Sequence, residues 1–203
     1  ENAMLHKEAV ERARLETEMD IARQVQTAIL PQSIPQVSGV DIFATSIPAF
    51  EVGGDFFDVI DRSAESLIFS LGDVTGKGMP AALLMSMAHT IIKAASRNMP
   101  FDHPHQVLNR LNHDMESDFS NVGMFTTVML GMVDCANCKL HFSNAGQSPI
   151  YYMPANGDAV LLEAQDIPVG ILDTVEYTTQ SLSLVHGDLF VAASDGFPES
   201  RNP

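Results

Sequence analysis

Basic residues are scarce in this sequence of 203 residues. There are 11 Lys and Arg against 26 Asp and Glu, which gives a formal net charge of −15. Proteins that bind the phosphates of nucleic acids or the surface of anionic membranes need clustered positive charge. We therefore expect no nucleic acid and no membrane among the partners. Long hydrophobic runs are also missing, and none approaches the length of a membrane-spanning segment.

Cysteines are few, and no secretory signal peptide is recognisable in the sequence. Both observations indicate a reducing compartment, so we expect a cytoplasmic protein. The two cysteines, Cys135 and Cys138, have the spacing of some zinc and redox sites. Without a second cysteine pair or a following helix, this spacing favours a hairpin loop between two strands over a metal or redox site.

Glycine and proline do not occur in residues 5–30, where apolar side chains recur at helical spacing. This pattern predicts one long helix that ends at Pro31 and Pro35. We assign residues 1–35 to an N-terminal linker helix and residues 36–203 to one folded domain, because a hydrophobic content of 45% suffices for a sizeable core. The broad apolar face of the helix fits two interpretations. It is either docked on its own domain or forms a coiled-coil-like linker that dimerises or transmits a signal.

Strands dominate the rest of the sequence, and two helices interrupt them. Helices are predicted at residues 79–98 and 104–119, each with a proline near its first turn. Short apolar or β-branched runs between turn residues predict strands at 40–50, 56–60, 67–71, 126–133, 139–143, 150–153, 159–162, 175–182 and 188–193. Strands, then a helix pair, then more strands indicate an α+β fold in which helices pack on antiparallel sheets.

Three acidic motifs flanked by glycine stand out: Gly53-Gly54-Asp55-Phe56-Phe57-Asp58, Gly72-Asp73-Val74-Thr75-Gly76-Lys77-Gly78 and Ser194-Asp195-Gly196. The second and third motifs directly follow strand-like apolar runs. One Asp-Gly at a strand end is typical of an ordinary turn. Carboxylates gathered from three segments, however, repel one another, and Mg²⁺ or Mn²⁺ relieves that repulsion because these ions prefer oxygen ligands. The motifs therefore predict a two-metal hydrolytic site with Asp55, Asp73 and Asp195 as its acids.

The first motif contains two acids with different expected roles. In an extended segment, Asp55 shares a face with Phe57, whereas Asp58 lies on the opposite face. We expect Asp55 to bind metal and Asp58 to orient water or accept backbone hydrogen bonds. Five histidines show no partner spacing and are expected on helix surfaces or in loops: His89, His103, His105, His113 and His186.

The order of the motifs resembles that of the metal-dependent serine/threonine protein phosphatases (PPM family, type 2C), in the bacterial SpoIIE-like branch. Nearly the whole chain takes part in the resemblance. The matching segments are residues 22–26, Leu30-Pro31, 53–58, 72–82, 124–127, Asn144-Ala145-Gly146-Gln147-Ser148-Pro149, 168–170, 187–189 and 194–202. Each motif alone is weak, but their order and spacing together are specific.

The resemblance implies two stacked antiparallel β-sheets flanked by α-helices, with two Mn²⁺ or Mg²⁺ ions at one edge. Carried over by position, Asp55 and Asp73 contact the metals, with Asp73 bridging both, while the Val74 carbonyl and Asp195 each serve one ion. An activated water then hydrolyses phosphoserine or phosphothreonine without a phosphoenzyme. The implied substrate is a phosphorylated anti-sigma-factor antagonist. An upstream sensor or receiver domain is implied to act through the N-terminal helix, which is also a possible homodimer contact.

Two departures from the family pattern bear on function. Gln147 stands where the family often has His, a position outside the implied metal ligands. The sequence also stops before the family's closing helix and last metal-binding turn, so we expect the C-terminal end of the domain to be missing. The alternative function is a catalytically inactive phosphatase-like module that binds or regulates. The retained acids argue against it, because a phosphate-binding module favours Arg or Lys.

Overall fold

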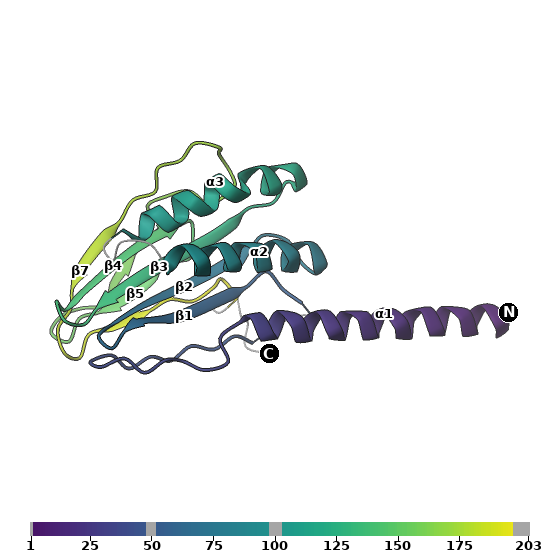
Figure 1. Ribbon diagram of the computed structural model, residues 1–203, viewed down its shortest axis with the longest axis horizontal. Coiled ribbons are helices and arrows are strands. Elements are labelled where there is room, and N and C mark those ends of the chain that lie inside the picture. The colour runs from purple at the N-terminus through teal and green to yellow at the C-terminus, as the bar shows by residue number, and fades with distance from the viewer. Residues whose placement is uncertain (1, 48–51, 98–102, 197–203) are drawn as a thin grey trace.

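The computed structural model describes residues 2–47, 52–97 and 103–196. Two antiparallel sheets and three helices make up this part of the chain, which confirms the expected fold class (Figure 1). The five-stranded sheet has the order β1-β2-β3-β4-β7 and the three-stranded sheet the order β6-β5-β8. The elements are α1 (Asn2–Ile29), β1 (Phe56–Ser63), β2 (Ser66–Val74), α2 (Met79–Ser96), α3 (Pro104–Val122), β3 (Thr126–Asp134), β4 (Lys139–Ala145), β5 (Ile150–Met153), β6 (Val160–Leu162), β7 (Gln180–Ser183) and β8 (Leu189–Val191).

Helices α2 and α3 lie side by side on one face of the five-stranded sheet (Figure 1). Their buried positions recur every three or four residues, as in Leu108, Leu111 and Met115 of α3, so one apolar stripe of each helix faces the sheet. Both helices carry a proline in their first turn, where its missing N–H costs no intrahelical hydrogen bond. This packing forms the first of two hydrophobic cores.

The second core lies between the two sheets. Phe190 of β8 meets Phe69 of β2 and Phe142 of β4 edge to face, with ring centroids 5.7 and 5.8 Å apart. Strand β3 is buried at nearly every position because it is central in its sheet and is covered by helices on one side and by the small sheet on the other. In a sandwich of this kind, polar groups of the central strands reach the surface at the ends of the strands.

Strand register brings distant segments to one edge of the large sheet. Phe56 at the start of β1 pairs with Gly72, and Val74 at the end of β2 pairs with Thr126 at the start of β3. The same edge holds the end of β4, because Val128 pairs with Ala145. Residues that precede β1 and follow β2 are therefore neighbours in space.

Most predicted elements are present, with one clear exception. The strand predicted at residues 40–50 is wrong for residues 41–47, which form no strand, and residues 48–50 lie outside the described part. Here the chain makes one isolated bridge, between Val37 and Val40, in place of a sheet partner. Strands β7 and β8 are also shorter than the predicted runs at 175–182 and 188–193.

The two cysteines and the long helix follow the sequence expectation. Cys135 and Cys138 form no disulfide and lie in the turn between β3 and β4, as predicted for a hairpin loop. Helix α1 has 28 residues and projects away from the sandwich, touching it only near its C-terminal end (Figure 1). None of the helices within the described residues combines the length and apolar character needed to cross a membrane.

Candidate active site

Asp73 is the penultimate residue of β2, and Asp55 lies in the loop just before β1. Gly54 allows the two segments to approach. A Cβ added to Gly54 would lie 2.3 Å from the Val74 carbonyl oxygen and 3.0 Å from Oδ1 of Asp73, so a larger residue would push the loop away. Gly54 of the first motif thus serves a close backbone approach rather than a left-handed turn.

The two carboxyl groups are in direct contact and influence each other's protonation. Burial, the charges of Asp55 and Asp195 and a hydrogen bond with Asp55 raise the pKa of Asp73 to about 7. Partial enclosure by protein atoms is the main cause that raises the pKa of Asp55 above its ordinary value. Hydrogen bonds from Ser194 and Asp73 offset part of this increase, while the charge of Asp195 adds to it. Such perturbed carboxyl groups are typical of functional sites.

The third acid comes from the segment after β8. The Ser194 hydroxyl donates to Oδ2 of Asp55 at 3.2 Å, which ties this segment to the first motif. Asp195 is exposed and acts on Asp55 and Asp73 through its charge. Within residues 2–47, 52–97 and 103–196, no three or more His, Cys, Asp or Glu side chains are arranged as a finished metal site. The edge gathers the three predicted acids, with Asp195 less closely held than the other two.

The donor set at this edge fits a hard divalent cation. It consists of carboxylate oxygens and, next to Asp73, the backbone carbonyl of Val74. Burial, followed by the charges of Asp55 and Asp195, raises the pKa of Asp73 and so disfavours its ionised form in the absence of a cation. A bound cation would stabilise the ionised forms, and Mn²⁺ or Mg²⁺ favours such oxygen ligands.

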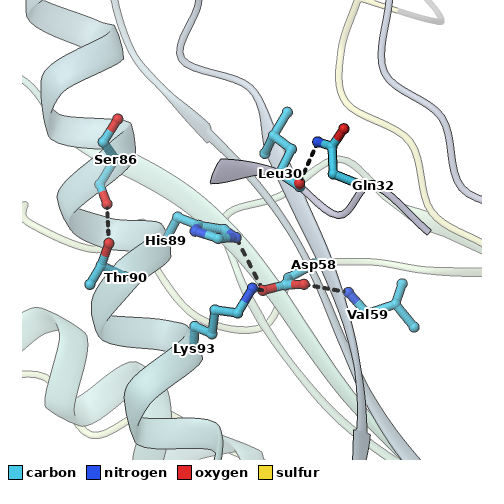
Figure 2. Close-up of polar contacts among 8 residues, drawn as sticks. All are labelled: Leu30, Gln32, Asp58, Val59, Ser86, His89, Thr90 and Lys93. Atoms are coloured by element: carbon cyan, nitrogen blue, oxygen red, sulfur yellow. Dashed lines mark hydrogen bonds and ion pairs between the residues drawn. The ribbon is translucent and has the colours of Figure 1, made fainter. Parts of the chain in front are cut away.

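Asp58 does not belong to this edge. Its side chain is 3% exposed and points to α2, where Oδ2 lies 3.1 Å from both His89 Nε2 and Lys93 Nζ (Figure 2). Its Oδ1 accepts a hydrogen bond from the Val59 backbone N–H. This last contact agrees with the expected backbone role, and the carboxylate also contacts two side chains of α2. The expectation of a surface role for His89 is wrong, because its ring is buried between β1 and α2.

Gln26 is a site residue that sequence reasoning missed. Its side-chain Nε2 donates to the Gly53 carbonyl at 2.8 Å, and its Oε1 accepts from the Gly53 N–H at 3.0 Å. Gly53 lies two residues before Asp55, so the end of α1 holds the loop that carries an acid of the site. A neutral glutamine gives no charge or spacing signal, and only its place in the matching segment of residues 22–26 could have indicated a role.

Comparisons with known proteins identify the family of this chain. Residues 63–203 match the family model described as Stage II sporulation protein E (SpoIIE). The chain is 34% identical over 190 residues to phosphoserine phosphatase RsbU of Bacillus subtilis, covering 92% of this chain and 55% of RsbU. It thus spans about half the length of that relative.

Solved structures show the same fold. The SiaA-PP2C domain of Pseudomonas aeruginosa superposes with a TM-score of 0.75 at 24% identity, covering 93% of this chain and 75% of that one. The PP2C phosphatase domain of SpoIIE from Bacillus subtilis, with a fragment of its regulatory domain, gives a TM-score of 0.60 at 19% identity, covering 74% and 45%. With a PP2C-type fold and a family model that matches most of its length, this chain belongs to the SpoIIE family of bacterial PPM-type proteins.

Proposed function

We propose that this chain is the catalytic domain of a metal-dependent protein phosphatase that acts on phosphoserine or phosphothreonine. The observation that carries the proposal is the meeting of Asp55, Asp73 and Asp195, from three separate segments, at one edge of the sandwich. Family membership and the similarity to a phosphoserine phosphatase support it. In this proposal residues 36–203 form the phosphatase domain, residues 1–35 form the linker, and the protein acts in the cytoplasm.

The proposed chemistry is hydrolysis of a phosphate ester by water. Asp55, Asp73, Asp195 and the Val74 carbonyl would hold two Mn²⁺ or Mg²⁺ ions, which activate water and neutralise the phosphoryl oxygens. The chain itself supplies the positions of these oxygens. Gly54 lets Asp55 reach Asp73, and Ser194 orients one oxygen of Asp55. Water and the phosphoester are consumed, and the free hydroxyl and inorganic phosphate are released.

The proposed substrate is a phosphorylated protein of the anti-sigma-factor antagonist type. With only 11 Lys and Arg in 203 residues, the chain has little positive charge to hold a small anion by itself. Binding energy must then come from a protein surface near the site. Binding energy from contacts away from the reacting phosphate raises turnover when it positions the reacting groups.

The test compares kcat/KM for a phosphorylated antagonist protein with that for free phosphoserine and for an aryl phosphate, at the same Mn²⁺ concentration. We expect the protein to be preferred by at least an order of magnitude. Equal values for all three substrates would contradict a protein substrate. Absence of Mn²⁺-dependent hydrolysis for all of them, in the longest natural form of the protein, would contradict the phosphatase function.

A second candidate function is a phosphatase-like module that binds without catalysis. It is favoured by the observation that the described residues include no finished metal site. The same assay separates the two candidates. The binding module should retain the phosphoprotein with its phosphate intact, whereas the phosphatase should release inorganic phosphate.

Helix α1 is proposed to connect this site to an upstream sensor or receiver domain and to contact a second copy of the chain. Six large apolar side chains among the described residues of this helix are more than half exposed: Met4, Leu5, Val10, Leu15, Ile21 and Val25. An apolar groove between α1 and α2 is lined in part by Ala22, Val25 and Leu83. A movement of α1 would shift the loop that carries Asp55, because two hydrogen bonds join Gln26 of the helix to Gly53 of that loop.

Two substitutions in α1 should therefore have different effects. Gln26→Ala should lower phosphatase activity about tenfold, because Gly53 loses both partners and the loop before Asp55 is released.

Val25→Glu should reduce self-association, measured by sedimentation, because it places charge on the exposed apolar surface. Gln24→Ala, at an exposed position of the same helix, is the control. Unchanged activity of Gln26→Ala would show that the contact does not act on the site, and an unchanged mass for Val25→Glu would contradict dimerisation.

A further inference from the structure

The peptide unit between Asp73 and Val74 is held on both sides. Its carbonyl oxygen accepts from the Thr126 hydroxyl at 2.9 Å and lies 3.4 Å from the Thr127 hydroxyl. Its N–H, which belongs to Val74, donates to the Gly54 carbonyl at 3.2 Å. The directions of the Asp73 side chain and of the Val74 carbonyl both depend on this peptide. Groups that hold it therefore control two of the oxygens proposed to bind metal.

Gln147 reaches this peptide from the turn after β4. The residue is 4% exposed. Its backbone is fixed by Asn144, whose Oδ1 accepts from the Gln147 N–H at 2.8 Å and whose Nδ2 donates to the Gln147 carbonyl at 3.3 Å. Gly146 provides the required left-handed turn with a φ of +72°. The side-chain amide of Gln147 then contacts the Thr127 hydroxyl.

The count of protons decides which end of this amide faces Thr127. The Thr127 hydroxyl has one proton and two acceptors within reach, the Asp73 carbonyl and Oε1 of Gln147. With Oε1 facing Thr127, the buried Nε2 has no hydrogen-bond partner in the part of the chain that the structure describes. The two ends of a carboxamide have the same shape, so hydrogen bonding determines its orientation. The opposite orientation lets Nε2 donate to Thr127, whose own proton is then directed to Asp73.

We propose that Gln147 is a positioning residue for the metal-binding edge, an inference that rests on the proposed function. Its Nε2–H donates to the Thr127 hydroxyl, and this hydroxyl donates to the Asp73 carbonyl. The relay of two hydrogen bonds joins the turn after β4 to the peptide that carries Asp73 and Val74. Outer groups of this kind orient metal ligands, and their removal weakens metal binding. Gln147 itself does not touch metal or substrate in this proposal.

The competing explanation is that Gln147 only stabilises the turn in which it lies. A purely structural role predicts lower stability of the whole sandwich and equal effects along β2. The relay predicts a local effect at the end of β2. Amide hydrogen exchange in the metal-free protein separates these explanations, because it reports each backbone N–H individually.

The experiment measures exchange of the Val74 amide in Gln147→Met and Thr127→Val. Each should exchange about fivefold faster than wild type at Val74, the effect of one lost net hydrogen bond, with little change at residues 67–69 of the same strand. The double variant should be no faster than either single one, because both remove the same relay. Thr127→Ser keeps the hydroxyl and should behave as wild type. The matched control is Gln165→Met, at an exposed glutamine near the same sheet edge.

Calorimetric titration with Mn²⁺ supplies the second measurement. The Kd for Mn²⁺ should rise about tenfold in Gln147→Met and in Thr127→Val and stay unchanged in Thr127→Ser. Wild-type exchange at Val74 in Gln147→Met, or equally faster exchange throughout β2, would overturn the relay. The exchange result tests the relay alone. Failure of the wild-type protein to bind Mn²⁺ is a separate outcome, and it would overturn both the proposed function and the metal-positioning role.

Discussion

Replacing Asp73 by asparagine is expected to lower phosphatase activity by about 10²- to 10³-fold and to remove most Mn²⁺ binding. Asp73 lies at the end of β2, in contact with Asp55 and within the field of Asp195. An amide keeps the size of the side chain but removes the charge that would hold a cation. Activity assays and calorimetric Mn²⁺ titration on the longest natural form of the protein would measure both effects.

The same substitution should stabilise the metal-free fold. Burial and the neighbouring acids raise the pKa of Asp73 from 3.8 to about 7, so the folded state favours the protonated acid. The ionised form therefore costs stability, and this cost is absent well below the unfolded pKa and complete above the folded one. Asp73→Asn should gain about 1–2 kcal/mol over wild type at about pH 8 and almost nothing at about pH 3.

Asp61→Asn, on the exposed part of β1, removes a carboxylate without touching the edge and should change neither metal binding nor activity. If Asp73→Asn binds Mn²⁺ with wild-type affinity, Asp73 is not a metal ligand. A lower stability of the metal-free variant at high pH would show that the fold does not disfavour the ionised form of Asp73.

The fold was predictable because its signals are local and repetitive. Helix α3 shows apolar residues at helical spacing between Pro104 and Gly123, and β3 is a continuous apolar run. Residues 40–47 mislead because they are rich in apolar and β-branched residues, such as Val40 and Ile42, although no strand forms there. Whether such a segment joins a sheet depends on a free strand edge beside it, and that is decided by the tertiary structure.

The candidate site was predictable in part, because its acids carry glycine-flanked motifs. Gly54 has a function that the sequence only hinted at, since its neighbour across space, Val74, is known only from the fold. The supporting residues Gln26 and Gln147 are neutral and far from the acids along the sequence. Their roles depend on which backbone groups lie opposite them, and a spacing rule holds no information about that.

Asp58 is the acid for which sequence and structure differ most, and its loss should be the most destabilising change outside the hydrophobic cores. Burial alone would raise its pKa, but the contacts with His89 and Lys93 outweigh burial and lower it (Figure 2). Alternation along β1 places this side chain toward α2, opposite to Asp55. The buried contacts thus hold α2, which begins just after the second motif, against β1, which begins within the first motif.

Asp58→Ala should lower the free energy of unfolding by about 3 kcal/mol, because it leaves His89 and Lys93 without their carboxylate. This loss of stability is near the lower end of the range for removing one partner of a buried pair, since the Lys93 side chain is 35% exposed and can turn to water. Asp58→Asn keeps the shape and should cost less. Denaturant unfolding of both variants and of Asp61→Asn would measure these differences.

The pH dependence gives an independent check on this assignment. A folded pKa below the unfolded value means that Asp58 contributes stability above about pH 4, its ordinary range, and that this contribution is lost as the pH falls through the folded pKa. The difference between wild type and Asp58→Asn should therefore be constant near neutral pH and shrink in acid. A difference that grows in acid would mean that the ionised carboxylate is not the stabilising form. In that case the contacts of the ionised carboxylate with His89 and Lys93 would not hold α2 on β1.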